Sequence, residues 1–197
     1  MKKSKSIIFH EFGPPDKVLS IVEEEVPEPR AGEVLIRVEA SPINPADLNV
    51  IEGKYPKRPE LPAVAGMEGT GVIVSIGPEV SGCSAGDRVI VPHGSGAWRQ
   101  YNTVPASGVI IVPPDIPALQ AAMLKINPPT AWRMLHDFVK LQPGDWVIQN
   151  AANSAVGRAV IVMAKSMGAH TASVVRRPEL IPELKALGRR RRICRIG

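Results

Sequence analysis

The residue types between positions 144 and 157 are those of a phosphate-binding turn. A turn at residues 143–145 precedes a short apolar run, residues 146–148, which predicts a buried strand. Small and polar residues follow, and apolar positions then recur at helical spacing over residues 155–167. A strand, a tight turn and a helix make the first unit of a dinucleotide-binding fold. In that unit the turn backbone and the free N–H groups of the helix N-terminus bind a pyrophosphate.

Glycine is scarce in this turn. Of the three positions spaced as G-x-x-G-x-x-G, Ala151 and Ser154 occupy the first two and Gly157 the third. The spacing alone therefore leaves an ordinary strand–helix turn as an alternative. The candidate cofactor contacts at the turn are Asn153, Ser154, Ala155, Val156 and Gly157.

A pair of arginines follows the next expected strand, residues 170–175. Arg176 and Arg177 lie roughly twenty residues after the turn, where NAD-binding chains usually carry an acidic residue for the ribose hydroxyls. Guanidinium groups bind phosphate in a bidentate manner, so this pair favours the 2′-phosphate of NADP. Two solvated arginines at a strand end are the alternative.

The expected secondary structure that positions these residues changes near residue 117. Before it, short strands alternate with turns rich in glycine and proline, which predicts a small barrel or sandwich. The clearest strand is residues 33–40, where Val34, Ile36 and Val38 share one face. Further strands are expected at residues 6–10, 18–22, 69–76, 88–91, 98–104 and 110–112, with a short helix from Asn44 or Pro45 to Ile51.

After residue 117 helices and strands alternate. Residues 118–125 are expected to be helical, residues 127–129 to interrupt, and Thr130 to cap a helix that runs to about residue 139. The sequence thus predicts two domains, residues 1–117 and 118–188, followed by a basic tail at residues 189–197.

Composition narrows the classes of function. The formal net charge is +5, but the five arginines of residues 189–195 account for all of it, so nucleic acid is not an expected partner. Cys83 and Cys194 have no metal or disulfide spacing. The apolar run at residues 7–9 is too short for a signal peptide, and no run approaches the roughly 18 apolar residues of a membrane span. We expect a soluble, cytoplasmic protein without membrane contact.

Longer motifs carry a family resemblance. Residues 66–77, followed by residues 86–89, resemble the signature of the medium-chain dehydrogenase/reductase superfamily. Residues 42–49, 53–55, 59–64, 127–135 and 149–157 resemble the mitochondrial-type trans-2-enoyl-thioester reductases. The resemblance extends from residue 6 to about residue 188. It implies a mixed β and α/β fold: a GroES-like β barrel followed by a Rossmann domain, a doubly wound parallel sheet that is incomplete here.

The resemblance also implies an activity, the NADPH-dependent reduction of the C2=C3 bond of trans-2-enoyl thioesters on CoA or acyl carrier protein, in fatty acid synthesis. Hydride from nicotinamide C4 goes to C3, and a proton must reach C2. Tyr55 matches the family's proton donor; a phenol with an ordinary pKa of about 10 is protonated at neutral pH and can act as a general acid. Asn127 matches a family asparagine near the cofactor. Their alternatives are a loop anchor for Tyr55 and a helix N-cap for Asn127.

Two departures from the family pattern matter. Met67 occupies the position of a histidine in the zinc-using members, and catalytic zinc needs three protein ligands, so no metal is expected. Residues 189–197 offer no strand pattern where the family continues into a further strand, which suggests a truncated chain. We then expect the apolar faces of residues 146–148 and 172–175 to lack cover, which argues against the homodimer that the family type suggests and against measurable turnover.

Two other functions remain open. A zinc-free quinone or enone oxidoreductase of the same superfamily would share the fold and the NADPH turn. From a different class, the chain could be an inactive fragment whose basic tail binds acidic partners.

Overall fold

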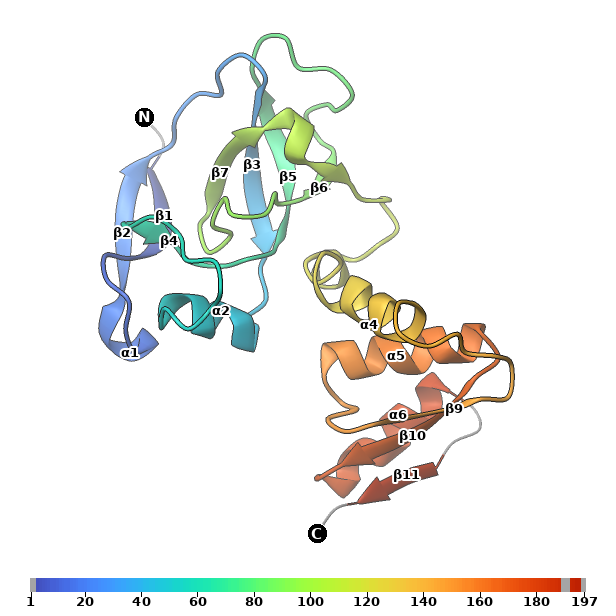
Figure 1. Cartoon of the computed structure of the whole chain (residues 1–197). Helices are drawn as coiled ribbons and strands as arrows, with labels where there is room; N and C mark the ends of the chain where they lie inside the picture. The colour runs from blue at the N-terminus through green and yellow to red at the C-terminus, as the bar shows by residue number, and fades with distance from the viewer. Residues whose placement is uncertain (1–2, 189–191, 196–197) are drawn as a thin grey trace. The chain divides into compact units, whose positions relative to one another are not determined.

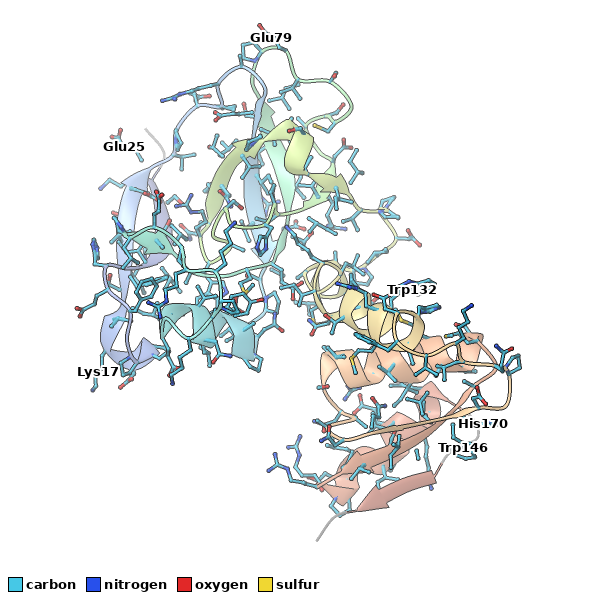
Figure 2. All side chains as sticks on the ribbon, in the orientation of Figure 1. Lys17, Glu25, Glu79, Trp132, Trp146 and His170 are labelled. Atoms are coloured by element: carbon cyan, nitrogen blue, oxygen red, sulfur yellow. The ribbon has the colours of Figure 1, made fainter. Side chains whose placement is uncertain are left out.

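The computed structural model describes residues 3–188 and the backbone of residues 192–195. The chain forms two compact units, Met1–Met123 and Leu124–Gly197, drawn as ribbons in Figure 1 and with side chains in Figure 2. The first unit therefore extends past residue 117, where the sequence places the change in character. No helix in the described part of the chain is both long and apolar enough to cross a membrane.

The described residues of the first unit form two antiparallel sheets. The smaller has the order β2-β1-β4 and the larger the order β7-β3-β5-β6-β8. Their bounds are β1 (Lys3–Phe9), β2 (Leu19–Glu25), β3 (Glu33–Ala40), β4 (Ala63–Val64), β5 (Thr70–Ile76), β6 (Arg88–Ile90), β7 (Tyr101–Pro105) and β8 (Ile110–Ile111). Short helices lie between these strands, α1 (Pro15–Val18), α2 (Pro45–Ile51) and η1 (Ala106–Gly108), and α3 (Ala118–Ala121) follows the last of them.

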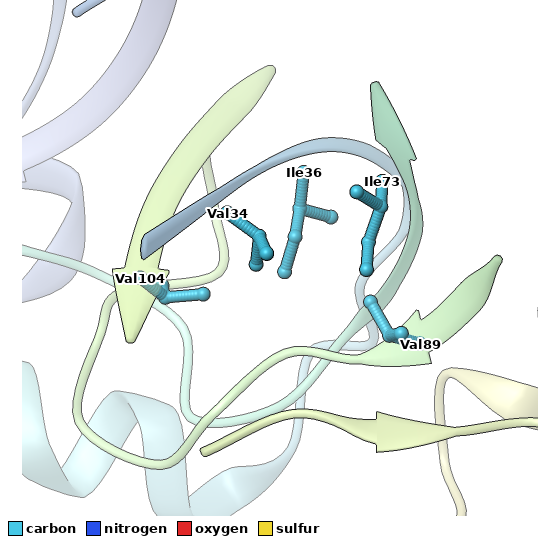
Figure 3. Packing of buried hydrophobic residues seen from close by; sticks show 5 residues of the cluster. All are labelled: Val34, Ile36, Ile73, Val89 and Val104. Carbon is cyan, nitrogen blue, oxygen red and sulfur yellow. The ribbon is translucent and has the colours of Figure 1, made fainter. Parts of the chain in front are cut away.

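The core of the larger sheet follows from the alternation in β3. Successive side chains of a strand point to opposite faces, so Val34 and Ile36 lie on the same face. They pack with one residue from each of three other strands of this sheet, β5, β6 and β7: Ile73, Val89 and Val104 (Figure 3). All five side chains are at most 1% exposed. The predicted bounds of this strand are confirmed, and so is its buried face at Val34 and Ile36. Val38 is only half-buried, and Leu35 on the opposite face is buried as well.

The two sheets are joined by backbone hydrogen bonds around β1. The amide of Ile7 donates to the carbonyl of Trp98 (2.9 Å), and the amide of Gln100 donates to the carbonyl of Lys5 (3.0 Å). Residues 98–100 are thus engaged by β1, and β7 begins only at Tyr101. The expected strand over residues 98–104 is wrong at its start because these non-local bonds take its first three residues.

In the described part of the second unit, helices pack on one face of a parallel sheet. Its elements are α4 (Asn127–His136), β9 (Trp146–Gln149), α5 (Ala155–Ser166), β10 (His170–Val175), η2 (Pro178–Leu180), α6 (Ile181–Leu187) and β11 (Arg192–Arg195). The sheet order is β11-β10-β9, and both pairings are parallel. Three parallel strands in the spatial order 3-2-1 with helical crossovers are the mononucleotide-binding half of a doubly wound sheet.

The last strand corrects the expectation for the C-terminal tail. Arg192–Arg195 pairs in parallel register with β10, so residues 192–195 continue the sheet, contrary to the expected absence of a strand. The remaining arginines of the run, residues 189–191, lie outside the described residues. A strand edge offers its backbone groups to any chain that can extend along it, whatever the side chains, which is why composition alone misses this pairing.

The start of α4 also differs from the expectation. The helix begins at Asn127, and Pro128 and Pro129 lie within its first turn, where amide groups have no intrahelical partner and proline is tolerated. The predicted interruption at residues 127–129 is therefore wrong. Thr130 is not the cap, because its hydroxyl donates to the carbonyl of Ile126 (2.6 Å) one turn earlier. In the preceding segment, α3 ends at Ala121 rather than at residue 125.

Strand β9 is less buried than its composition predicts. Val147 packs with Leu135 of α4 and Val160 of α5, whereas Trp146 is 56% exposed and Ile148 78% exposed. The rings of Trp146 and His170 on β10 lie in a tilted arrangement, with 4.9 Å between their centroids (Figure 2). The expectation of a buried strand is wrong for this face, because helices cover the other face alone. The expected lack of cover is therefore confirmed for Trp146 and Ile148. It is wrong for Val175 in the other expected stretch, residues 172–175, because that side chain is 2% exposed.

Candidate functional site

Two residues shape the turn between β9 and α5, one through its backbone conformation and the other through the lack of space for a side chain. Ala151 has a φ of +46°, a left-handed conformation that glycine adopts more readily. At Gly157 an added Cβ would lie 2.8 Å from both the Cα and the carbonyl oxygen of Ala152. The third position of the spacing therefore admits glycine only, and the first accepts alanine in a strained conformation. Turn and helix approach each other as closely as a pyrophosphate-binding turn requires.

Ser154 begins α5 as its N-cap. Its Oγ accepts a hydrogen bond from the amide of Gly157 at 3.1 Å. The amides of Ala155 and Val156 lie in the first turn, where no intrahelical acceptor exists. In a helix of 12 residues, these N–H groups and the positive end of the helix dipole favour an anion.

The turn and the arginine pair line one hollow of about 740 Å³. From the turn, Ala151, Asn153 and Ser154 contribute; Arg176 and Arg177 contribute from the end of β10. The ion pair of Arg177 with Glu179 is long (3.8 Å) and both side chains are 65% exposed, so it leaves the guanidinium accessible. Free amides beside two exposed guanidinium groups, in a cradle that a side chain at position 157 would fill, suit a phosphorylated dinucleotide.

Two polar residues that the sequence analysis did not single out hold this turn in place. Gln149, at the end of β9, donates through Nε2 to the carbonyl of Gly157 (3.1 Å) and to Oγ of Ser173 on β10 (3.2 Å). Arg158 donates through Nε to the carbonyl of Asn153 (3.0 Å). A polar residue at the end of an expected buried strand was the available signal for Gln149.

Arg158 also connects α5 to α6. Its two terminal nitrogens bind both carboxylate oxygens of Glu183. This hydrogen bonding lowers the pKa of Glu183 and raises the pKa of Arg158. The bidentate pair thus restrains Arg158, the fourth residue of α5, whose first turn carries the free amides.

In the first unit, Tyr55 lies on a loop fixed by the end of α2. The amides of Lys54 and Tyr55 both donate to the carbonyl of Asn49, at 2.8 and 3.1 Å. Gly53 turns the chain there with a φ of +70°, and its Cβ would lie 3.0 Å from Phe12. The half-buried Tyr55 side chain lines a hollow of about 470 Å³.

The floor of this second hollow is built around a buried carboxylate. Asp47 is 1% exposed; its Oδ2 accepts from the amide of Asn44 (2.6 Å) and its Oδ1 from the amide of Met67 (2.8 Å). Burial raises the pKa of Asp47, and these backbone hydrogen bonds act in the opposite direction. Asp47 therefore fixes both the start of α2 and the backbone of Met67, the residue in the zinc-histidine position. Among the described residues no group of three or more His, Cys, Asp or Glu side chains could hold a metal ion.

Asn127 lies apart from the arginine-lined hollow. It is the first residue of α4 and is 7% exposed. The N-cap of the helix is Ile126, so the alternative reading of Asn127 as an N-cap is wrong. The structure brings Asn153, Ser154, Arg176 and Arg177 to one hollow, and places Tyr55 in a separate hollow of the first unit.

Comparison with known proteins identifies a matching domain family and similar relatives. Residues 30–114 match the alcohol dehydrogenase GroES-like domain, which confirms the expected fold of the first part. Over 189 residues the chain is 46% identical to the human mitochondrial enoyl-[acyl-carrier-protein] reductase, covering 93% of this chain and 51% of the relative. The chain thus spans about half the length of the curated relatives it matches.

Solved structures show the same likeness over nearly the whole chain. The complex of Etr1p with NADP and crotonyl-CoA gives a TM-score of 0.89 at 30% identity and covers 98% of this chain and 61% of that one. The Etr1p/Etr2p heterodimer of Candida tropicalis gives 0.89 at 31% identity, with coverage of 98% and 61%. A Bacillus thuringiensis structure described as an NADPH:quinone reductase gives 0.85 at 34% identity, with coverage of 98% and 58%.

These comparisons correct one expectation. The human, frog and plant relatives are all named as mitochondrial enzymes, so the expected cytoplasmic location is wrong. That expectation rested on the absence of a signal-peptide core, a feature of secretion that does not distinguish cytoplasm from mitochondrion.

Proposed function

We propose that the chain is a member of the medium-chain dehydrogenase/reductase superfamily and carries the cofactor-binding and catalytic residues for reduction of trans-2-enoyl thioesters by NADPH. The observation that carries the proposal is its 46% identity to a mitochondrial enoyl-[acyl-carrier-protein] reductase over 189 residues. Thioesters on acyl carrier protein would place the reaction in fatty acid synthesis. Since the chain spans about half the length of such relatives, catalysis is assigned to this chain joined to a segment equivalent to their remaining length.

The arginine-lined hollow is the cofactor site in this proposal. The amides of Ala155 and Val156, with Asn153 and Ser154 beside them, bind the pyrophosphate, and Gly157 allows the close approach. Arg176 and Arg177 bind the 2′-phosphate, which NADH lacks. When bound, NADPH supplies the hydride for C3 of the substrate.

Tyr55 supplies the proton. As hydride adds to C3, the electron pair of the double bond moves toward the thioester carbonyl, and the Tyr55 hydroxyl then donates its proton to C2. The anchoring of Lys54 and Tyr55 to the carbonyl of Asn49 holds the phenol in one place, which a proton donor requires. Asn127, an uncharged donor at the start of α4, holds the ribose or positions the substrate.

The test is turnover by the chain joined to the C-terminal half of a matched relative. Tyr55→Phe should retain NADPH binding and lose about 10²–10⁴-fold in reduction of crotonyl-CoA, the usual contribution of general acid catalysis. Tyr101→Phe, in β7 of the same unit, is the matched control and should keep its turnover. A Tyr55→Phe enzyme within a few-fold of the unsubstituted one would remove Tyr55 from the mechanism.

Quinone or enone reduction is the second candidate, favoured by the likeness to the Bacillus thuringiensis structure. It would use the same NADPH turn. Turnover of quinones but not of crotonyl- or hexenoyl-thioesters by the joined chain would establish it in place of the enoyl reduction.

A further inference from the structure

The hollow that holds Tyr55 has a cationic mouth that the proposed reaction does not use. Lys57 and Arg58 follow Tyr55 on the same loop and line the same hollow. Both are exposed, whereas Tyr55 is half-buried. Three residues span at most about 11 Å of extended chain. A single elongated substrate could therefore contact Tyr55 and the two cations at once.

These two charges are not neutralised by neighbouring side chains. Lys54, on the same loop, pairs with Glu52 at 2.9 Å, but no carboxylate of the described residues lies within ion-pair distance of Lys57 or Arg58. The guanidinium of Arg58 lies 5.6 Å from the ring centroid of Phe12. That contact orients the group without cancelling its charge.

Two carboxylates line the hollow, Asp47 and Glu60, and they differ in how strongly they would repel an anion bound at its mouth. Both oxygens of Asp47 are occupied by backbone amides on the buried floor. Glu60 also lines the hollow and is exposed, so its single negative charge leaves a net positive charge beside Lys57 and Arg58. Much of the remaining lining is small or apolar, including Val50, Ala63 and Val64. A hollow of this kind, with an apolar interior and a net positive mouth, suits a ligand with an uncharged arm and an anionic end.

We propose that Lys57 and Arg58 bind the phosphate at the end of the substrate's pantetheine arm. This inference rests on the proposed function, because the arm is what CoA thioesters and acyl-carrier-protein thioesters share. In both carriers an uncharged pantetheine chain separates the thioester from a phosphate. The acyl end then lies toward Tyr55 and the phosphate toward the loop cations, which makes them residues for substrate specificity.

Pantetheine and 4′-phosphopantetheine, which differ by one phosphate, test this on the 197-residue chain by calorimetry. The phosphorylated probe should bind about tenfold more tightly, the lower end expected of a charge-assisted hydrogen bond, and added salt should shrink the difference. Lys57→Gln/Arg58→Gln should abolish the preference, and Lys57→Arg/Arg58→Lys should keep it. Lys5→Gln/Arg30→Gln, which removes two exposed cations of the same unit away from the hollow, should also keep it.

Crotonyl-CoA and crotonyl-acyl carrier protein distinguish the two sources of the phosphate. Lys57→Gln/Arg58→Gln should weaken binding of both by a similar factor, and the carrier that the unsubstituted chain binds more tightly identifies the source. Weakening of only one carrier would overturn the shared-phosphate assignment.

Equal binding of pantetheine and 4′-phosphopantetheine by the unsubstituted chain would also overturn the inference, as would an unchanged preference after Lys57→Gln/Arg58→Gln. Neither result touches the Tyr55→Phe turnover assay. Failure of the proposed reduction appears there, and failure of the phosphate contact appears in the binding of the two probes.

Discussion

The backbone at Ala151 and the packing at Gly157 set opposite demands on single side chains in the cofactor turn. A non-glycine residue in the left-handed region costs about 1–2 kcal/mol, part of which glycine would return as chain entropy. At Gly157, by contrast, any Cβ meets the backbone of Ala152 at 2.8 Å. The turn therefore has glycine at position 157, where packing leaves no room for a side chain. It has alanine at position 151, where only the backbone conformation favours glycine.

Substitutions at these two residues should change the free energy of unfolding in opposite directions. Ala151→Gly should stabilise the second unit by about 0.5–1 kcal/mol. Gly157→Ala should destabilise it by about 1–3 kcal/mol through overpacking, although helix propensity alone predicts a gain of about 1 kcal/mol. Urea unfolding measures both, and a stabilised Gly157→Ala chain would contradict the packing argument.

At the scale of elements, the pair Arg158–Glu183 fixes α5 to α6 in a pH-dependent way. The pKa of Glu183 is lowered from the ordinary value of 4.5, so its contribution to stability is present above pH 4.5 and is lost as the pH falls through the folded-state pKa. Glu183→Gln should therefore reduce the loss of stability below pH 4.5. Thermal unfolding between pH 3 and 7 checks this, with Glu179→Gln on η2 as the control; identical acid profiles for Glu183→Gln and the unsubstituted chain would contradict it.

Elements governed by local patterns could be predicted from the sequence, and those governed by distant partners could not. The alternation in β3, the helical spacing that begins at Ala155 and the run that forms β10 were all sufficient. The start of β7 depends on bonds to β1, and the pairing of β11 depends on the edge of β10, neither of which a local pattern contains. The local apolar run predicted a buried strand at Ile148, whereas the incomplete sheet predicted its exposure, because the cover of a strand face belongs to the whole sheet.

The features of the candidate site also divide into those that local spacing predicted and those that depend on distant segments of the chain. The turn and the arginine pair were predicted from spacing and lie in one hollow. The supporting bonds of Gln149 were missed because they join β9 to both α5 and β10. The position of Lys57 and Arg58 at the mouth of the Tyr55 hollow was missed because a hollow is formed by segments far apart in the sequence.

At the scale of the whole molecule, the uncovered face of the parallel sheet should govern association. Trp146 and Ile148 are exposed there, and an open apolar sheet face favours contact with other chains. We expect concentration-dependent self-association in sedimentation velocity, reduced by Ile148→Lys without loss of folding. Val162→Lys, at an exposed apolar position of α5, should leave association unchanged; a monomeric unsubstituted chain at high concentration would contradict this prediction.

The central claim is that this chain carries an NADPH-binding unit, and its most direct test is a comparison of NADPH and NADH affinities for the 197-residue chain. NADPH should bind more tightly, because the proposal assigns Arg176 and Arg177 to the 2′-phosphate, which NADH lacks. Arg176→Ala/Arg177→Ala should cost NADPH roughly 1.5–3 kcal/mol of binding free energy and leave NADH unchanged, while Arg133→Ala on α4 should alter neither. Equal affinities of the unsubstituted chain for the two nucleotides would contradict the account.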